Sequence, residues 1–237
     1  MNAKRSFKKA FILCVCLGLY VSLAVGFVSI HSLGQADRSR ITKDYALAKK
    51  YYLEGLKHKK DGKLDKAQEK FVKSVEVSPN FPESFVELGN IYMRQKNFDR
   101  AIEEYDKAEE SYLRLEAYVS KGIISTAAWK REFDVASREL YRDLQEPNFA
   151  IPPKVYFFKG GAYFRKGMLK EASEQFHRTI ALDPNHGDAH NNLAVIYYLT
   201  KQYDIAWKHL RLAEENGAKV NPKFVEDLKK AAPEPKK

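Results

Sequence analysis

The sequence has 237 residues, enough for one or two ordinary domains. Its net charge is +10, from 41 basic and 31 acidic residues, and four of the basic residues lie within residues 1–10. The remaining excess is too small for a dedicated nucleic-acid-binding protein, so we expect no nucleic-acid partner. The only two cysteines, Cys14 and Cys16, lie in an apolar run, which excludes a disulfide or a cysteine-based zinc site from the rest of the chain.

The chain begins with a basic head at residues 1–10, followed at residues 11–30 by an uncharged apolar run. A run of this length matches a helix that crosses a bilayer. A cleaved signal peptide is the alternative, because Gly34-Gln35-Ala36 offers small residues for cleavage, but the run is long for that class. We expect a transmembrane helix or signal anchor with a cytoplasmic N-terminus, because positive charge beside a membrane helix favours that side.

Residues 31–42 are polar and predict a linker, after which Thr42 can cap a helix that runs towards Lys60. The pair Asp61-Gly62 predicts a turn, because glycine tolerates the left-handed conformation at a helix end. A second helix is expected from about Leu64 to Val77, ending at Ser78-Pro79. These elements predict a helical hairpin.

The residues at 153–186 have a pattern that recurs along the chain. Large residues and a glycine occupy one predicted helix, an alanine and a phenylalanine occupy the next, and a proline ends it: Tyr156, Gly160, Tyr163, Ala172, Phe176 and Pro184. Three further stretches repeat these spacings, with Tyr51, Gly55, Ala67, Phe71, Ser74 and Pro79; Phe85, Leu88, Gly89, Tyr92, Ala101, Tyr105 and Ala108; and His190, Ala194, Tyr197, Ala206, Leu210 and Ala213. The pattern resembles the tetratricopeptide repeat (TPR) over roughly residues 48–220.

This resemblance implies an all-α fold, a TPR superhelix behind the N-terminal transmembrane helix. We expect a TPR domain at residues 43–220, with repeats at 48–81, 82–115, a degenerate 116–152, 153–186 and 187–220. Asn221 as the cap with Pro222 in the first helical position predicts a capping helix at 221–231, and residues 232–237 are expected to be disordered.

No group of residues forms a convincing catalytic site, so we expect no enzyme activity, no cofactor, no metal and no small-molecule substrate. His186 and His190 are four residues apart, but His190 falls on a core position of its repeat and is better explained as structural. An acidic run on the second helix of repeat 82–115 is expected to be a solvated outer face. Its members are Glu103, Glu104, Asp106, Glu109 and Glu110.

In the family that the chain resembles, the first helices of the hairpins line a concave groove. Carried onto this sequence, the groove positions include a set that we expect to bind a partner, namely Tyr52, Asn90, Arg94, Phe157, Phe164, Asn191 and Tyr198. Phe157, Phe164 and Tyr198 are expected to converge there. Tyr52 and Leu56 replace the basic and amide residues of the family's carboxylate clamp, so that mode is not expected.

The groove composition suits a peptide segment or an amphipathic helix held by apolar anchors. The sequence therefore predicts a single-pass membrane protein whose TPR domain is periplasmic or otherwise extracytoplasmic. We expect a membrane-tethered scaffold that binds protein partners and helps to assemble or organise a cell-envelope complex. The alternatives are a secreted or periplasmic soluble adaptor, released by signal-peptide cleavage, and a regulatory subunit of an enzyme complex.

Overall fold

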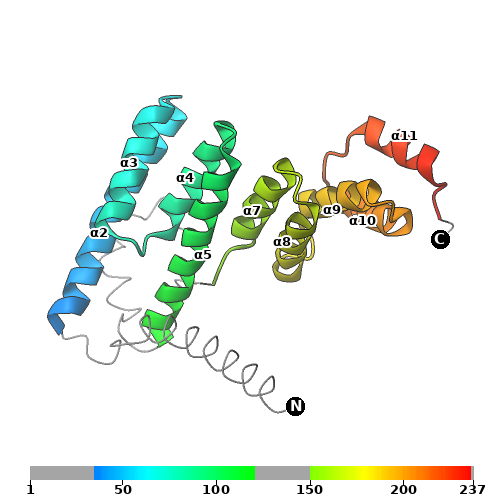
Figure 1. Cartoon of the computed structure of the whole chain (residues 1–237). Coiled ribbons are helices and arrows are strands. Elements are labelled where there is room, and N and C mark those ends of the chain that lie inside the picture. Colours follow the sequence, from blue (N-terminus) through cyan, green and yellow to red (C-terminus); the bar gives the residue numbers. More distant parts are fainter. Residues whose placement is uncertain (1–34, 121–149, 236–237) are drawn as a thin grey trace, which may run out of the picture. The chain divides into compact units, whose positions relative to one another are not determined.

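A computed structural model describes residues 35–120 and 150–235, with side chains from Arg40 onward in the first range. Both ranges are helical and contain no strand (Figure 1). The helices are α2 (Gln35–Lys60), α3 (Leu64–Val77), α4 (Pro82–Arg94), α5 (Phe98–Ser120), α7 (Pro153–Arg165), α8 (Leu169–Leu182), α9 (Gly187–Leu199), α10 (Tyr203–Glu215) and α11 (Pro222–Ala231). The predicted all-α fold is confirmed for this part of the chain.

Three of the predicted segments fall in other parts of the sequence. The basic head, the apolar run at 11–30 and most of the degenerate repeat at 116–152 lie outside the described residues. Within the two described ranges, no helix has the length and apolar character needed to cross a bilayer.

The first described helix begins earlier than the sequence predicts. Helix α2 starts at Gln35, so the segment predicted as a linker at 31–42 is helical from Gln35 onward, and Thr42 lies inside the helix instead of capping it. Residues 35–42 contain neither proline nor glycine, so nothing in the backbone interrupts a helix there. The cap signal at Thr42 is therefore not used.

The turn inside each hairpin has one residue in the left-handed conformation. Gly62 and Gly167 have φ angles of 74° and 79°, as glycine at a helix end allows, whereas Lys96 and Lys201 occupy the equivalent positions with φ angles of 58° and 60°. The same pair of backbone hydrogen bonds closes each turn, for example Lys201 N to Tyr198 O at 3.0 Å and Gln202 N to Tyr197 O at 2.8 Å. Lysine costs about 1–2 kcal/mol in this conformation.

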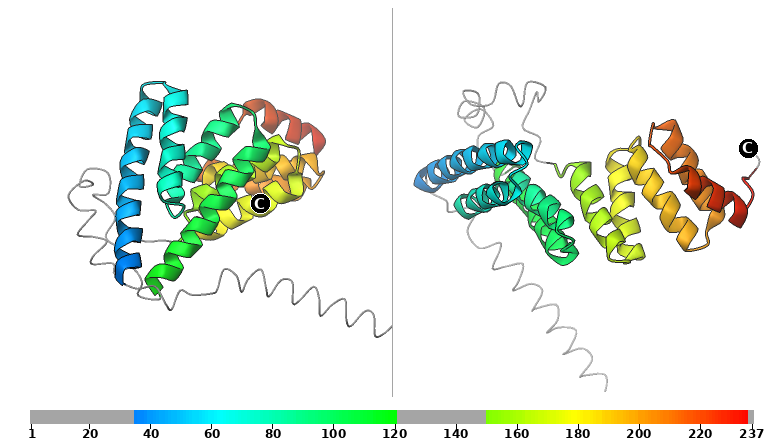
Figure 2. Two further views of the ribbon diagram at one scale, coloured as in Figure 1. Left: turned by 60° about the vertical axis from the view of Figure 1, so that its left-hand side comes forward. Right: turned by 90° about the horizontal axis from the view of Figure 1, so that it is seen from above.

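In the first three described hairpins, an aromatic ring from the second helix lies against a glycine of the first. The pairs are Phe71 with Gly55, Tyr105 with Gly89, and Phe176 with Gly160, and all three rings are fully buried. A Cβ atom on any of these glycines would lie only 2.5–2.9 Å from the ring. Glycine therefore sets the close approach of the two helices. Figure 2 shows the paired helices from two directions.

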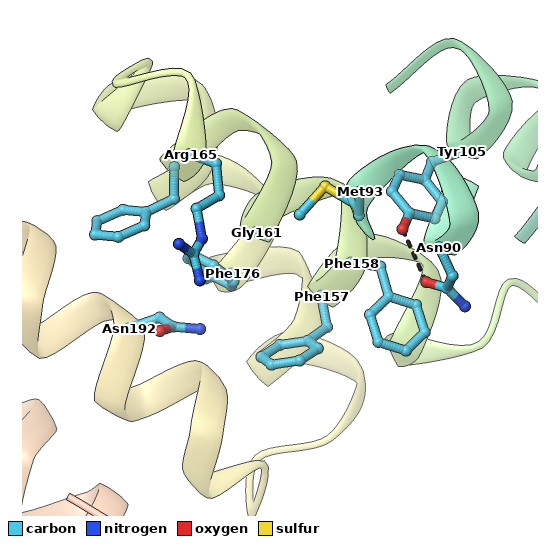
Figure 3. Close-up of a pocket in the computed structure, with 10 residues that line it drawn as sticks. Asn90, Met93, Tyr105, Phe157, Phe158, Gly161, Arg165, Phe176 and Asn192 are labelled. Carbon is cyan, nitrogen blue, oxygen red and sulfur yellow. Dashed lines mark hydrogen bonds between the residues drawn. The ribbon is translucent and has the colours of Figure 1, made fainter. Parts of the chain in front are cut away.

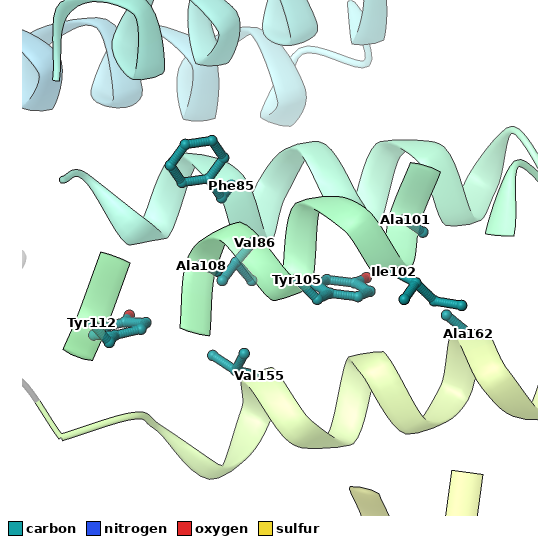
Figure 4. Close-up of a cluster of buried hydrophobic side chains, with 9 residues drawn as sticks. All are labelled: Phe85, Val86, Ala101, Ile102, Tyr105, Ala108, Tyr112, Val155 and Ala162. Atoms are coloured by element: carbon teal, nitrogen blue, oxygen red, sulfur yellow. The ribbon is translucent and has the colours of Figure 1, made fainter. Parts of the chain in front are cut away.

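Helix α5 packs directly against α7, although residues 121–149 separate them in the sequence. A single apolar core is shared by α4, α5 and α7 (Figure 4). Its buried members are Phe85, Val86, Ala101, Ile102, Tyr105, Ala108, Tyr112, Val155 and Ala162. The hairpins α4–α5 and α7–α8 are therefore adjacent, at the place where the sequence predicts an intervening repeat. Helix α5 also continues to Ser120, past the predicted boundary at residue 115.

A buried lysine joins these two helices. The ammonium of Lys159 on α7 lies 2.5 Å from Asp106 Oδ1 and 2.9 Å from Glu109 Oε2 on α5. Burial alone lowers the pKa of Lys159, but hydrogen bonds to both carboxylates raise it overall. Two members of the acidic run that is predicted to be a solvated face, Asp106 and Glu109, thus form ion pairs with a lysine of the neighbouring helix. The sequence alone does not predict this ion pair, because Lys159 and Glu109 are 50 residues apart.

Helix α11 covers the last hairpin. Asn221 accepts a hydrogen bond from Lys223 N at 3.0 Å, with Pro222 as the first helical residue, so the predicted cap is confirmed. Leu228 is fully buried against α9 and α10. The segment after α11, predicted to be disordered, contacts α10 as far as it is described, because Arg211 binds Pro235 O at 2.7 Å and Glu234 Oε1 at 3.0 Å.

Candidate functional site

An open pocket of about 310 Å³ lies between α4, α7 and α9. Helices α4 and α7 supply most of its walls, α9 supplies one side chain, and Tyr105 and Phe176 contribute from the core (Figure 3). The lining residues are Asn90, Met93, Tyr105, Phe157, Phe158, Gly161, Phe164, Arg165, Phe176 and Asn192. The surface is thus mainly aromatic, with two amides and one guanidinium.

Gly161 opens this pocket on α7. No atom lies within 4 Å of the position that a Cβ would take on Gly161, whereas a Cβ on the adjacent Gly160 would clash with the Phe176 ring at 2.9 Å. The two neighbouring glycines therefore serve different purposes, because Gly160 faces the packed core and Gly161 faces the pocket. The guanidinium of Arg165, one turn further along α7, extends into the space between Phe157, Phe176 and Asn192 (Figure 3).

The aromatic side chains that line the pocket are held in place by ring packing and by a hydrogen bond. The Phe157 ring packs against Phe158 and Phe176, each with a centroid distance of 5.8 Å, and against the His186 ring at 4.6 Å. The hydroxyl of Tyr105 donates to Asn90 Oδ1 at 2.9 Å, which leaves the amide nitrogen of Asn90 as a donor. Burial raises the pKa of Tyr105 well above its usual range, so this hydroxyl stays protonated.

The structure brings three of the seven predicted groove residues into the pocket, namely Asn90, Phe157 and Phe164. Tyr198 does not join the two phenylalanines, because its ring packs edge-on against Phe224 of α11 at 5.6 Å. In this structure Tyr198 therefore lies apart from the two phenylalanines. The capping helix covers Tyr198.

The other three predicted residues also lie outside the pocket lining. Tyr52 packs against Phe71 and Phe81, with centroid distances of 5.8 and 5.3 Å, and so contributes to the core of the first hairpin. Arg94 is exposed at the end of α4, and Asn191 is partly buried on α9. The pocket contains Arg165 of α7 and Asn192, the residue after Asn191.

Three pocket residues outside the predicted set of seven, Phe158, Arg165 and Asn192, each directly follow a predicted groove position. The predicted stripe takes only one residue per turn, but a pocket wall on a helix is wider than that. Side chains on a helix also lean towards its N-terminus, so a given surface spot is covered by a residue about one position further on. Including the residue directly after each predicted groove position would therefore have identified these pocket residues from the sequence.

Two family models match the chain, one described as "Tetratricopeptide repeat" at residues 82–112 and one as "TPR repeat" at residues 160–201. The chain contains tetratricopeptide repeats. Both matched segments contribute to the pocket. The Tetratricopeptide repeat-containing protein trd-1 of Caenorhabditis elegans is 29% identical over 157 residues, which is 66% of this chain and 19% of that protein. The chain thus spans about a fifth of the length of this curated relative.

Several solved structures are similar to this chain. A structure of MamA from MSR-1 is 20% identical, covers 71% of this chain and 76% of its own, and has a TM-score of 0.47. PilW, described as a widely conserved type IV pilus biogenesis factor, is 16% identical, with coverages of 78% and 86% and a TM-score of 0.45. YrrB, described as a TPR protein with an unusual peptide-binding site, is 19% identical, with coverages of 76% and 90% and a TM-score of 0.31.

Apart from the pocket, a cluster of three histidines lies between the last two TPR hairpins. Its members are His177, His190 and His209. His190 Nε2 lies 3.0 Å from Pro184 O, which can only accept, so this nitrogen carries the proton. In a neutral His190, Nδ1 is then an acceptor. His209 Nδ1 therefore carries a proton and donates it to His190 Nδ1 in a hydrogen bond of 2.9 Å. His190 is thus a structural histidine, as its core position predicts. In the described ranges, no group of three or more His, Cys, Asp or Glu residues is arranged to hold a metal.

We expect this cluster to make the fold less stable in mild acid. Burial, followed by the nearby His190, His177 and Lys208, lowers the pKa of His209 to about 4. Since the unfolded-state pKa is about 6.5, the contribution of His209 is complete above that value and is lost as the pH falls towards 4. At pH 5 this single group lowers the free energy of unfolding by about 2 kcal/mol relative to pH 7.5.

The measurement is urea unfolding of the full chain, followed by circular dichroism, at pH 5 and pH 7.5. The control is His209→Gln, which keeps a polar side chain but cannot titrate, so its loss of stability between the two pH values should be smaller by a similar amount. An equal pH dependence in both proteins would show that His209 does not resist protonation in the folded state.

Proposed function

We propose that this protein is a membrane-tethered TPR scaffold that binds a segment of a partner protein in the pocket between α4, α7 and α9. The observation that carries the proposal is the aromatic, open pocket itself, built on the first helices of successive TPR hairpins. A pocket of this size and lining is typical of a binding site, because apolar walls supply affinity and a few polar groups supply orientation. Extended or helical peptides are the ligands that suit apolar anchors placed along a row of helices.

Phe157 is the central residue of the proposed site. Its ring is half-buried, so it has packing partners on one side and a free face towards the pocket. Rigid aromatic anchors of this kind dominate binding energies when a partner covers them. Asn90, Phe164 and Arg165 would complete the contact surface. Tyr52 and Tyr198 are left out, because they belong to the packing of the first hairpin and of α11.

The tether is the second part of the proposal. The uncharged run at 11–30 is long enough to cross the hydrocarbon layer. With the N-terminus in the cytoplasm, the TPR domain would project into an extracytoplasmic space, where it would help to organise a complex in the cell envelope. A protein released by cleavage near Ala36 is the alternative form of the same adaptor.

To test the proposal, membranes are washed at alkaline pH and extracted with mild detergent, and the full chain is purified from the extract. We expect the chain to stay with the washed membranes and to retain a co-purifying protein partner. Phe157→Ala should weaken binding of that partner by about 2 kcal/mol, or roughly thirtyfold. Its loss of stability should be smaller than that of truncating the fully buried Phe176, because the Phe157 ring is only half-buried.

Tyr198→Ala is the matched control, because it removes an aromatic ring that packs against α11 outside the pocket. It should affect the unfolding midpoint more than partner recovery. Equal partner recovery with Phe157→Ala and the unchanged protein would reject the groove. Release of the chain by the alkaline wash, with a mature N-terminus near Ala36, would support the cleaved form instead.

A further inference from the structure

We infer that the pocket around Gly161 binds a partner segment that presents one large apolar side chain next to a carboxylate. This inference rests on the proposed function, since it names the ligand chemistry of the same site. The apolar side chain would enter the space above Gly161, and the carboxylate would bind Arg165. The argument has one part for each of these groups.

The apolar part follows from the pocket walls. Five aromatic rings and the thioether of Met93 line it, and the only side chains that bring polar ends are Asn90, Arg165 and Asn192, besides the Tyr105 hydroxyl that Asn90 already occupies. The space above Gly161 is empty of side chains within 4 Å of a Cβ position. An aromatic or large aliphatic side chain fills such a space with favourable contacts, whereas a charged group there would lose its hydration.

The carboxylate part follows from the charges on α7. Lys159 pairs with Asp106 and Glu109, and Lys166 pairs with Asp99. Arg165 lies between them in sequence and is exposed, and none of the carboxylates in the described ranges forms an ion pair with it. The pocket lining contains no acidic residue.

A guanidinium directed into an apolar pocket without an acidic neighbour is complementary to an anion. Its planar fork matches a carboxylate with two parallel hydrogen bonds. A nucleic acid fits less well, because binding its backbone relies on several cations that neutralise successive phosphates. The lining offers a single cation. The ligand that the pocket suits is therefore an acidic segment of a protein with an apolar anchor.

The test screens a phage-displayed library of random 12-residue peptides on the full chain in mild detergent. Enriched peptides are then synthesised, and their dissociation constants are measured by fluorescence anisotropy. We expect them to share an aromatic or large aliphatic residue with Asp or Glu within about three positions. Gly161→Leu, which fills the pocket, should weaken them about thirtyfold, and Arg165→Glu about tenfold. Lys170→Glu is the control, because it makes the same change of charge on an exposed position of α8 outside the pocket.

The outcomes separate the inference from the proposed function. If the peptides lose affinity with Phe157→Ala but contain no acidic residue and bind Arg165→Glu unchanged, the groove is confirmed and the carboxylate inference is overturned. If they bind Phe157→Ala, Gly161→Leu and the unchanged chain equally, both proposals fail. Tighter binding of a single-stranded oligonucleotide than of any peptide also overturns the inference. Circular dichroism checks that the variants fold. If Gly161→Leu does not fold, Arg165→Glu still tests the inference, because Arg165 is exposed and its replacement should not disturb the fold.

Discussion

Replacing Phe176 by alanine is expected to lower the free energy of unfolding by about 3–5 kcal/mol. The Phe176 ring is fully buried on α8 and packs against Phe157 and against the backbone at Gly160. A truncated side chain leaves a cavity, and Gly160 has no side chain that could move into it. The neighbouring helices cannot close the gap either, because α7 is fixed on its other face by α5.

The measurement is the midpoint of urea unfolding at constant slope, followed by circular dichroism. Leu182→Ala is the matched control on the same helix, because Leu182 is 54% exposed and its truncation should change the stability by less than about 0.5 kcal/mol. A shift no larger than that of the control would contradict the burial of Phe176. Partner binding should weaken in parallel, since Phe176 supports the Phe157 ring at the pocket.

Gly89→Ala is expected to destabilise the fold by about 2–3 kcal/mol, although alanine is the better helix former. A Cβ at this position would lie 2.5 Å from Cε1 and 2.8 Å from Cζ of Tyr105. The ring cannot move away freely, because it is fully buried and its hydroxyl binds Asn90. The cost of displacing a core ring outweighs the gain in helix propensity of about 1 kcal/mol.

Gly161→Ala provides the control, with the opposite sign. It also places alanine in the first helix of a TPR hairpin, but its Cβ meets no atom within 4 Å, so the variant should be more stable by about 0.5–1 kcal/mol. The two variants are compared by thermal unfolding under the same conditions. If both shifted the midpoint in the same direction, the close approach of Tyr105 to Gly89 would not determine the stability of that hairpin.

Both predictions bear on the site, because the same contacts that stabilise the hairpins also shape the pocket. Tyr105 and Phe176 belong to the core and to the pocket lining at once. Their partners on the first helices are the glycines that let α4 and α7 approach α5 and α8 closely. We therefore expect substitutions at this layer to lower stability and binding together, whereas substitutions at Gly161 and Arg165 should change binding without destabilising the fold.

The hairpins are predictable from the amino-acid sequence alone. Each hairpin turn depends on one residue and its neighbours, so Gly62 predicts the first turn correctly, and Asn221-Pro222 predicts the start of α11. The pairing of Phe71, Tyr105 and Phe176 with glycines was also readable, because the repeat fixes the spacing between two helices of one hairpin. Three pocket residues, Asn90, Phe157 and Phe164, are among the groove positions that the resemblance to the repeat family implies.

Which hairpins are neighbours, and what covers their surfaces, depends on tertiary contacts. The direct packing of α5 on α7 depends on contacts between residues far apart in sequence, such as Lys159 with Glu109, and no local spacing encodes such a pair. The covering of Tyr198 by Phe224 likewise depends on where α11 folds back. A repeat pattern specifies how one helix meets the next within a unit, because those residues are close in the chain. The contacts between distant units arise from complementary side-chain shape and charge, which become apparent only once the helices are packed.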